Sequence, residues 1–175
     1  MQIIGVVGKQ NAGKDTLVEY LRDRHGVAAL STGDVVRRLA EKECVACTRR
    51  KLHDLAAELI ARRGEDYMSG LMIRRIEEND WDCVAVNGLR TPADVRDLRD
   101  RFGGDFTLVR VTTDDPKKRF QRSADRGETC DTDCYDEFLS LDEVEQTLFD
   151  IDRTLEMADV SVPNNGTVDE FHSAI

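Results

Sequence analysis

The sequence predicts an α/β fold, a three-layer sandwich in which a five-stranded parallel sheet carries helices on both faces. Short apolar runs alternate with helical stretches along the whole chain, which is the pattern of strand–helix–strand units. The apolar run at 83–86 is continuous rather than alternating, as expected for a strand covered on both faces. With 175 residues, 40% of them hydrophobic and 34% charged, the chain suffices for one compact domain spanning 1–175.

Five segments have the apolar character of buried strands. The first runs directly into a glycine loop, and each of the others is flanked by polar or helical sequence. The strands are expected at residues 2–8, 27–30, 83–86, 106–111 and 160–162. Because ligands of parallel sheets bind beyond the carboxyl ends of the strands, the functional residues are expected at those ends.

Helices are expected between the strands. Thr91 before Pro92, and Asp115 before Pro116, match the preference for a capping side chain followed by proline in the first turn. The stretch 34–79 is predicted as two or three helices, broken near 43–48 and at Gly64. Further helices are predicted at 14–25 and 136–157.

Composition excludes several classes of function. The net charge is −10 and aromatic residues make up 6%, so the chain should repel phosphate backbones and lacks an aromatic nucleic-acid platform. No apolar run approaches the roughly 18 residues of a membrane span. The opening residues 1–8 predict a strand rather than a signal peptide, so we expect a cytoplasmic protein that binds neither nucleic acid nor membrane.

The acidity is spread along the chain, with 19 Arg against 6 Lys. Such a surface suits a salt-rich cytoplasm, where screening weakens self-repulsion, and it equally suits an ordinary acidic enzyme. Both interpretations stay open at this point.

A phosphate-binding loop follows the first strand. The segment 8–16 reads GKQNAGKDT and matches G-x-x-x-x-G-K between a buried strand and a helix. Its backbone N–H groups, the helix N-terminus and the charge of Lys14 favour bound phosphates. The residues expected to hold the nucleotide are Gly8, Asn11, Ala12, Gly13, Lys14, Asp15 and Thr16.

The position after Lys14 is unusual for such a loop. Ser or Thr commonly stands there as a magnesium ligand, but this chain has Asp15 followed by Thr16. Either the carboxylate of Asp15 joins the magnesium ligands directly, or Thr16 supplies the oxygen. The loop therefore predicts ATP and Mg²⁺ as cofactors, and either Asp15 or Thr16 can be the magnesium ligand.

The remaining motifs favour a kinase among the enzymes that use this loop. A regulatory GTPase would need an Asn-Lys-x-Asp string after a strand, and a motor ATPase would usually show an apolar strand ending in two acids. Neither is found in the sequence. Phosphoryl transfer to a small molecule is the class that remains.

A second motif carries a resemblance to a known superfamily. The segment 31–37, STGDVVR, together with the phosphate loop, resembles the adenylate-kinase-like nucleoside monophosphate kinases, which include dephospho-coenzyme A kinases and deoxynucleoside monophosphate kinases. The resemblance implies the P-loop NTPase fold with a helical acceptor-binding insertion at about 34–79 and a lid at about 119–136. It also implies a small-molecule nucleotide acceptor for a monomer or homodimer.

The resemblance implies roles for individual residues. Thr32, Arg37 and Arg90 would contact the acceptor, although the neighbouring Arg38 leaves open which arginine turns inward. Asp34 would hold magnesium-bound water or accept a proton. Lys14, Asp34, Arg122 and Arg126 would form the catalytic set, with Asp15, Thr16 and Asp34 as candidate metal ligands. The loop residues Asn164, Asn165 and Gly166 would lie beside the adenine.

Two features keep alternatives open. The strand at 83–86 runs into Asn87, where related chains commonly have an acid, so a nucleotide-binding regulator stays possible beside a nucleoside monophosphate kinase and a dephospho-coenzyme A kinase. Two cysteine pairs, 44 with 47 and 130 with 134, offer four thiols, but they fall in regions expected to separate during turnover, which disfavours structural zinc.

Overall fold

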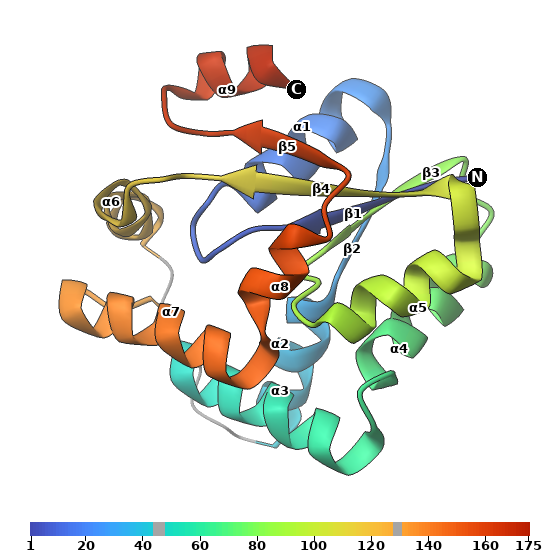
Figure 1. The fold of residues 1–175 in the computed structure, drawn as a ribbon, viewed down its shortest axis with the longest axis horizontal. Helices are drawn as coiled ribbons and strands as arrows, with labels where there is room; N and C mark the ends of the chain where they lie inside the picture. Colours follow the sequence, from blue (N-terminus) through green and yellow to red (C-terminus); the bar gives the residue numbers. More distant parts are fainter. Residues whose placement is uncertain (44–47, 128–130) are drawn as a thin grey trace.

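The computed structural model describes residues 1–43, 48–127 and 131–175. Within these residues a five-stranded sheet has the order β2-β3-β1-β4-β5, and every neighbouring pair is parallel (Figure 1). The predicted α/β fold with a five-stranded parallel sheet is therefore confirmed. The strands are β1 (Gln2–Val7), β2 (Ala28–Ser31), β3 (Cys83–Asn87), β4 (Phe106–Thr112) and β5 (Val160–Pro163).

The helices follow the predicted order with two refinements. The stretch predicted at 34–79 comprises three described helices, and the second ends before Gly64, whose φ of 105° a residue with a side chain rarely adopts. The stretch predicted at 136–157 is interrupted at Asp150, whose φ of 54° is left-handed and breaks the helical path. The helices are α1 (Lys14–His25), α2 (Thr32–Lys42), α3 (Arg49–Arg63), α4 (Tyr67–Glu77), α5 (Pro92–Phe102), α6 (Pro116–Arg126), α7 (Tyr135–Phe149), α8 (Ile151–Glu156) and α9 (Val168–Ala174), with a 3₁₀ turn η1 at Gly103–Asp105.

Both proline-marked starts have the expected capping side chains. The Thr91 hydroxyl accepts a hydrogen bond from the Asp94 N–H, and the Asp94 carboxylate accepts one from the Thr91 N–H. Asp115 caps α6 by accepting from the Lys117 N–H. These short-range bonds satisfy N–H groups that an isolated helix start leaves without partners, so the local sequence fixes where α5 and α6 begin.

The sheet has a hydrophobic core on each face. On one face α1 and α9 cover a cluster that includes Val6, Leu17 and Phe171, and on the other α4 and α5 cover a cluster that includes Ile76 and Leu98. Figure 1 shows α1 and α9 on one side of the sheet and α5 and α8 on the other. This arrangement gives the three layers, and the loop after the central strand β1 lies at the carboxyl ends of the strands.

A third cluster holds a helical layer beside these strand ends. Helix α3 packs against α2, α4 and α7, and the buried side chains there include Val36, Leu52, Met68 and Phe149. Because Phe149 comes from α7 and Val36 from α2, the cluster joins segments far apart in the sequence. It fixes α3 opposite the phosphate loop.

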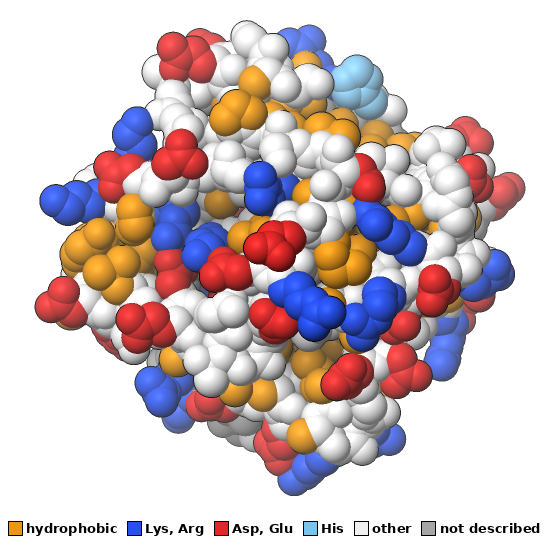
Figure 2. Space-filling model, viewed as in Figure 1, with side chains coloured by type: hydrophobic (Ala, Val, Ile, Leu, Met, Phe, Trp, Pro, Cys, Tyr) orange, Lys and Arg blue, Asp and Glu red, His pale blue; other side chains and the backbone are white. Residues whose placement is uncertain are grey.

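The surface carries charges of both signs. On the face shown in Figure 2, acidic and basic side chains are interspersed rather than gathered into one patch of a single sign. Among the described residues, no helix is long and apolar enough to cross a membrane.

Candidate active site

The phosphate loop lies between the end of β1 at Val7 and the start of α1 at Lys14. Two of its residues, Asn11 and Gly13, have positive φ values of 57° and 106°, which allow the tight turn. Gly8 is required by close packing, because a Cβ there would lie 2.7 Å from the carbonyl oxygen of Val111 on β4. The loop is thus built on the central strand and pressed against its neighbour.

Lys14 folds back over this loop. Its Nζ donates hydrogen bonds to the carbonyl oxygens of Gly8 at 2.7 Å and Lys9 at 2.9 Å. Burial lowers the pKa of Lys14 to about 8, although the negative charges of Glu145 and Asp15 act in the opposite direction. Its charge is therefore sensitive to pH in a range that binding experiments can reach.

We expect affinity for a metal-free nucleoside diphosphate to fall as the pH rises above 8. The pKa of Lys14 is about 8 in the free protein, so the ammonium that attracts phosphate is lost as pH rises. If only the charged form binds, the dissociation constant at pH 9.5 should be roughly 30-fold above its value at pH 7. Calorimetric titration with ADP in EDTA measures this. In a Lys14→Met variant the weaker residual affinity should not change over this range, and a wild-type curve equally flat would refute the link.

Three adjoining cavities surround the loop. The first lies between α1, α6 and the β5–α9 segment and is lined by Gly13, Thr16, Arg122, Asn164, Gly166 and Phe171 among others. The second is polar and is lined by Lys14, Asp15, Asn87 and four arginines. The third is largely apolar. Each shares lining residues with the next, so the three lie in a row past the loop, and together they are called the channel below.

Four arginines from four different segments converge on the polar cavity. They are Arg37 of α2, Arg49 of α3, Arg90 after β3 and Arg126 of α6. Arg38 is exposed, so the structure answers which of the two adjacent arginines turns inward: it is Arg37. Positive charge therefore gathers around this cavity of an acidic chain, as suits a polyphosphate.

Carboxylates hold these arginines in place. Asp131, of which only 6% of the side chain is exposed, accepts from Arg49 at 2.6 Å and from Arg126 at 2.7 Å. Burial alone would raise the pKa of Asp131, but the hydrogen bonds from both arginines outweigh it and lower the pKa. Arg37 pairs with Asp34 at 2.6 Å. Asp131 therefore joins α3 to the end of α6 across the channel.

A buried carboxylate holds the arginine at the end of β3. Glu145 of α7 forms an ion pair with Arg90 at 2.9 Å and lies 3.4 Å from Nε2 of His53. Burial on its own would raise the pKa of Glu145, but the charge of Arg90 and the contact with His53 hold it well below the usual range. Burial lowers the pKa of His53. The group is therefore a fixed Glu145–Arg90 ion pair beside a neutral imidazole.

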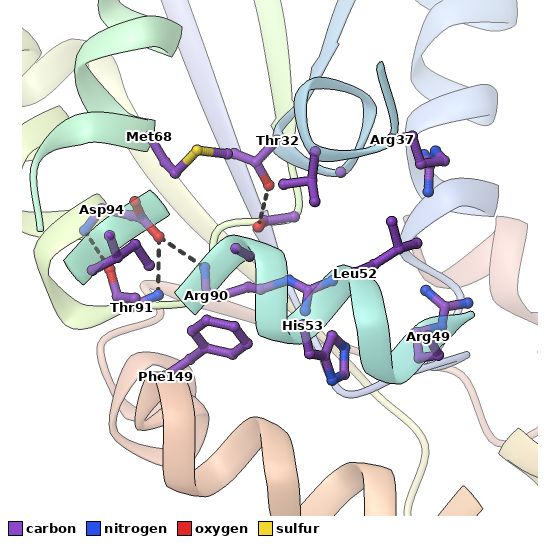
Figure 3. Close-up of a pocket in the computed structure, with 15 residues that line it drawn as sticks. Thr32, Arg37, Arg49, Leu52, His53, Met68, Arg90, Thr91, Asp94 and Phe149 are labelled. Atoms are coloured by element: carbon purple, nitrogen blue, oxygen red, sulfur yellow. Dashed lines mark hydrogen bonds between the residues drawn. The ribbon is translucent and has the colours of Figure 1, made fainter. Parts of the chain in front are cut away.

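The third cavity combines an apolar wall with a charged mouth (Figure 3). Leu52 and His53 approach it from α3, Met68 from α4 and Phe149 from α7. Arg37, Arg49 and Arg90 belong also to the lining of the polar cavity, and the Arg90 guanidinium lies 5.5 Å from the centre of the Phe149 ring. A ligand with a flat apolar body and an anionic end would match both parts of the cavity.

The predicted acceptor and catalytic residues differ in their surroundings. Thr32 is buried and donates to the carbonyl of Gly88 at 2.6 Å, at the wall of the apolar cavity. Asp34 lies in the first turn of α2, about half exposed, and does not belong to the described lining of the polar cavity. Arg122 donates to the Thr113 hydroxyl and to the Asn164 carbonyl. The structure thus brings Arg122 to the first cavity and leaves Asp34 outside the second.

The loop 164–166, which was predicted to lie beside the adenine, supports the phosphate loop through a hydrogen bond. The amide of Asn164, a buried residue, donates to the carbonyl of Ala12 at 2.9 Å. Asn165 instead exchanges hydrogen bonds with Asp114 at the surface. Gly166 lines the first cavity. Of the three predicted residues, Asn164 and Gly166 therefore adjoin the first cavity, and Asn165 faces the β4–α6 connection.

Sequence reasoning did not identify Gln10, Arg49, His53, Asp131 or Glu145. Gln10, Arg49 and His53 each have a buried side-chain atom that finds no hydrogen-bond partner among the described residues. Of these five, only Gln10 stands inside the recognised loop, where the motif fixes no residue type. The other four reach the channel through helix packing, which no local sequence pattern predicts.

The cysteine prediction lies mostly outside the described residues. Cys44, Cys47 and Cys130 are not described, while Cys134 is exposed and precedes α7. Among the described residues, no cluster of three or more His, Cys, Asp or Glu side chains is suited to hold a metal ion.

Comparisons with known proteins agree with the parallel sheet and the phosphate loop described above. Residues 4–148 match the family model described as AAA domain. The chain is 30% identical to a UPF0200 protein of Pyrococcus horikoshii, over 99% of this chain and 93% of the relative. It is 32% identical to one from Halobacterium salinarum, over 100% of this chain and 90% of the relative.

A solved structure supports the same fold at low identity. A gluconokinase from Sinorhizobium meliloti superposes with a TM-score of 0.62 at 15% identity, covering 99% of this chain and 88% of that one. The parallel sheet, the phosphate loop and this likeness together give the chain a P-loop kinase-like fold. By its match to the family model and to these relatives, the chain belongs to the AAA-domain family and to the UPF0200 proteins.

Proposed function

We propose that the protein transfers the γ-phosphate of ATP, with Mg²⁺, to a nucleotide-like acceptor, with a nucleoside or deoxynucleoside monophosphate as the leading class. The observation that carries the proposal is the sharing of Gly33, Arg37, Arg49, Gly88 and Arg90 between the polar cavity and the apolar one. A simple ATP-binding module needs the first two cavities only. The third supplies a place for a second ligand whose anionic end faces the phosphate loop.

The proposed reaction needs alignment rather than covalent help from the protein. An oxygen of the acceptor's phosphate forms a bond to the γ-phosphorus, and the bond from that phosphorus to the ADP oxygen breaks, so ADP leaves. Lys14 and the loop N–H groups would hold the donor phosphates. Arg37, Arg49 and Arg90 would hold the acceptor's phosphate, and Arg126 would neutralise charge between the two.

The chemistry of the third cavity favours a base-bearing acceptor over a sugar acid. Most of its wall offers no hydrogen bonds to a row of hydroxyl groups, and three of its polar side chains, Thr32, Thr91 and Asp94, already bond within the protein. The apolar side chains of this wall are Val36, Leu52, Ala56, Ile60, Met68 and Phe149. Burying hydroxyls against such a wall is costly, whereas a base can pack its faces on it. Dephospho-coenzyme A also carries a nucleotide, and it remains the alternative acceptor.

The residues beside the loop fit a magnesium ion. Mg²⁺ prefers oxygen ligands and keeps several waters. Asp15 and Thr16 offer a carboxylate and a hydroxyl at the start of α1, and the side-chain oxygen of Asn87 is buried with no hydrogen-bond partner among the described residues. When bound, Mg²⁺ would offset the charge of the donor phosphates. Asp34, paired with Arg37, is the more remote candidate ligand.

An acceptor panel separates the kinase from a nucleotide-binding regulator. ADP formation from MgATP should be measured alone and with each nucleoside and deoxynucleoside monophosphate, with dephospho-coenzyme A and with gluconate. The proposal expects a large rise in ADP with at least one nucleotide acceptor. A regulator would give the same slow ADP formation throughout, and a rise with gluconate alone would contradict the acceptor class.

Replacing Arg37 with alanine should chiefly weaken acceptor binding. Arg37 lines both the polar and the apolar cavity, so its loss removes a charge that would face the acceptor's phosphate. We expect the acceptor KM to rise about tenfold or more, with the KM for ATP changing by less than about twofold. The exposed neighbour provides the matched control, Arg38→Ala, which should leave both constants unchanged. An unchanged acceptor KM for Arg37→Ala would assign the phosphate to Arg49 and Arg90 instead.

A further inference from the structure

At two positions beside the phosphate loop, the charged and the neutral side chain stand in the reverse of the order usual in P-loop enzymes. In those enzymes a Ser or Thr hydroxyl after the loop lysine and an Asp at the end of a neighbouring strand hold the metal. Here the carboxylate stands after the lysine, at Asp15, and a neutral side chain stands at the end of β3, at Asn87. One negative charge is kept, but it has moved from the strand to the helix.

The two side chains are in direct contact. Nδ2 of Asn87 donates to Oδ1 of Asp15 at 2.6 Å. Only the amide nitrogen can donate to a carboxylate, so this bond fixes which way the Asn87 amide faces. Its oxygen is then left buried without a hydrogen-bond partner among the described residues, on a side chain that lines the polar cavity.

An unsatisfied buried oxygen at this place points to a ligand. Leaving such a group without a partner costs about 1–3 kcal/mol in general, and native structures seldom keep one without a reason. A bond that only tied α1 to β3 would not require an amide whose second polar atom is stranded. The oxygen, next to a carboxylate on the wall of the polar cavity, suits a hydrated cation.

We propose that Asp15 and Asn87, the exchanged pair, form the magnesium site: Asp15 supplies its negative charge, and Asn87 both orients Asp15 and contributes its amide oxygen. The inference rests on the proposed use of MgATP and deepens it. Asn87 is then the functional counterpart of the usual hydroxyl rather than a defect in the usual acid. The unusual residues at both positions, Asp15 and Asn87, are then explained together as parts of one metal site.

The pair can be tested by reversing it. In the double variant D15N/N87D the amide lies on α1 and the carboxylate on β3, so the hydrogen bond and the single charge are both kept. The readout is the ratio of two ADP dissociation constants from calorimetry, one in EDTA and one in Mg²⁺. This ratio measures what the metal adds to binding, independently of turnover.

We expect wild-type protein to bind ADP about tenfold tighter or more with Mg²⁺ than without. D15N should lose most of that ratio, and N87A should lower it several-fold. D15N/N87D should restore it to within about threefold of wild type. Thermal unfolding checks that each variant is folded, and N87A alone carries the comparison if D15N is not.

The outcomes separate this inference from the function on which it rests. If the wild-type protein binds ADP neither in EDTA nor in Mg²⁺, the proposed donor site itself fails. If metal-free binding is normal but D15N and N87A keep the wild-type ratio, the exchanged pair is not the metal site. A D15N/N87D ratio as low as that of D15N would also overturn the proposal. It would show that restoring one carboxylate and one amide to this pair does not restore metal-dependent binding.

Discussion

Replacing Lys14 with alanine should lower kcat for phosphate transfer by about 10³-fold or more, since it removes the full positive charge nearest the donor phosphates. The Nζ of Lys14 bonds to two loop carbonyl oxygens, at 2.7 and 2.9 Å, and so lies inside the curve of the loop. Steady-state kinetics with the best acceptor from the panel measure the loss.

Lys9 of the same loop provides the control. It pairs with Asp152 at 3.1 Å and lines none of the three cavities of the channel. Lys9→Ala should therefore keep kcat within about threefold of wild type. Wild-type turnover in Lys14→Ala would remove the donor site from this loop, and equal losses in both variants would indicate damage to the loop as a whole.

Replacing Glu145 with alanine should lower the free energy of unfolding by about 3 kcal/mol at pH 7, because it leaves the positive charge of Arg90 without its partner beside a buried imidazole. The carboxylate contacts Arg90 at 2.9 Å, and only 9% of the Glu145 side chain is exposed. Urea denaturation measures the change. The exposed Glu143 on the same helix gives the control, and Glu143→Ala should change the free energy by less than about 0.5 kcal/mol.

The effect of Glu145 should depend on pH in a defined direction. Its pKa in the folded protein lies below the ordinary value of 4.5, so its stabilisation is complete above that value and is lost as the pH falls below it. The difference between wild type and the isosteric Glu145→Gln should therefore shrink between pH 5 and pH 3. A difference that stayed constant over this range would show that the charge of Glu145 does not matter.

The fold could be predicted because its signals are local. A continuous apolar run, a capping threonine before a proline and a glycine at a helix end each act within a few residues of one another. The structure has strands at all five predicted places and the capping bonds at Thr91 and Asp115. The break at Asp150 was not predicted, since a left-handed residue that is not glycine leaves little trace in a helical pattern.

The channel was predictable only where a motif marks it. Lys14 and Arg37 stand in recognisable strings, and both line the polar cavity. Arg49 and Asp131 are 82 positions apart and meet only because α3 packs against α7 and so lies beside the segment that precedes α7. Pairing of this kind depends on tertiary packing, so a single sequence carries no signal for it.

The support of the phosphate loop by Asn164 has a consequence for how the protein matures. The amide that holds the Ala12 carbonyl comes from 152 positions later in the chain, and Arg122 reaches the same Asn164. During synthesis on the ribosome, the glycine-rich turn emerges long before Asn164, so the turn exists for a time without its brace. A product terminated before β5 would carry the turn without its brace throughout its life.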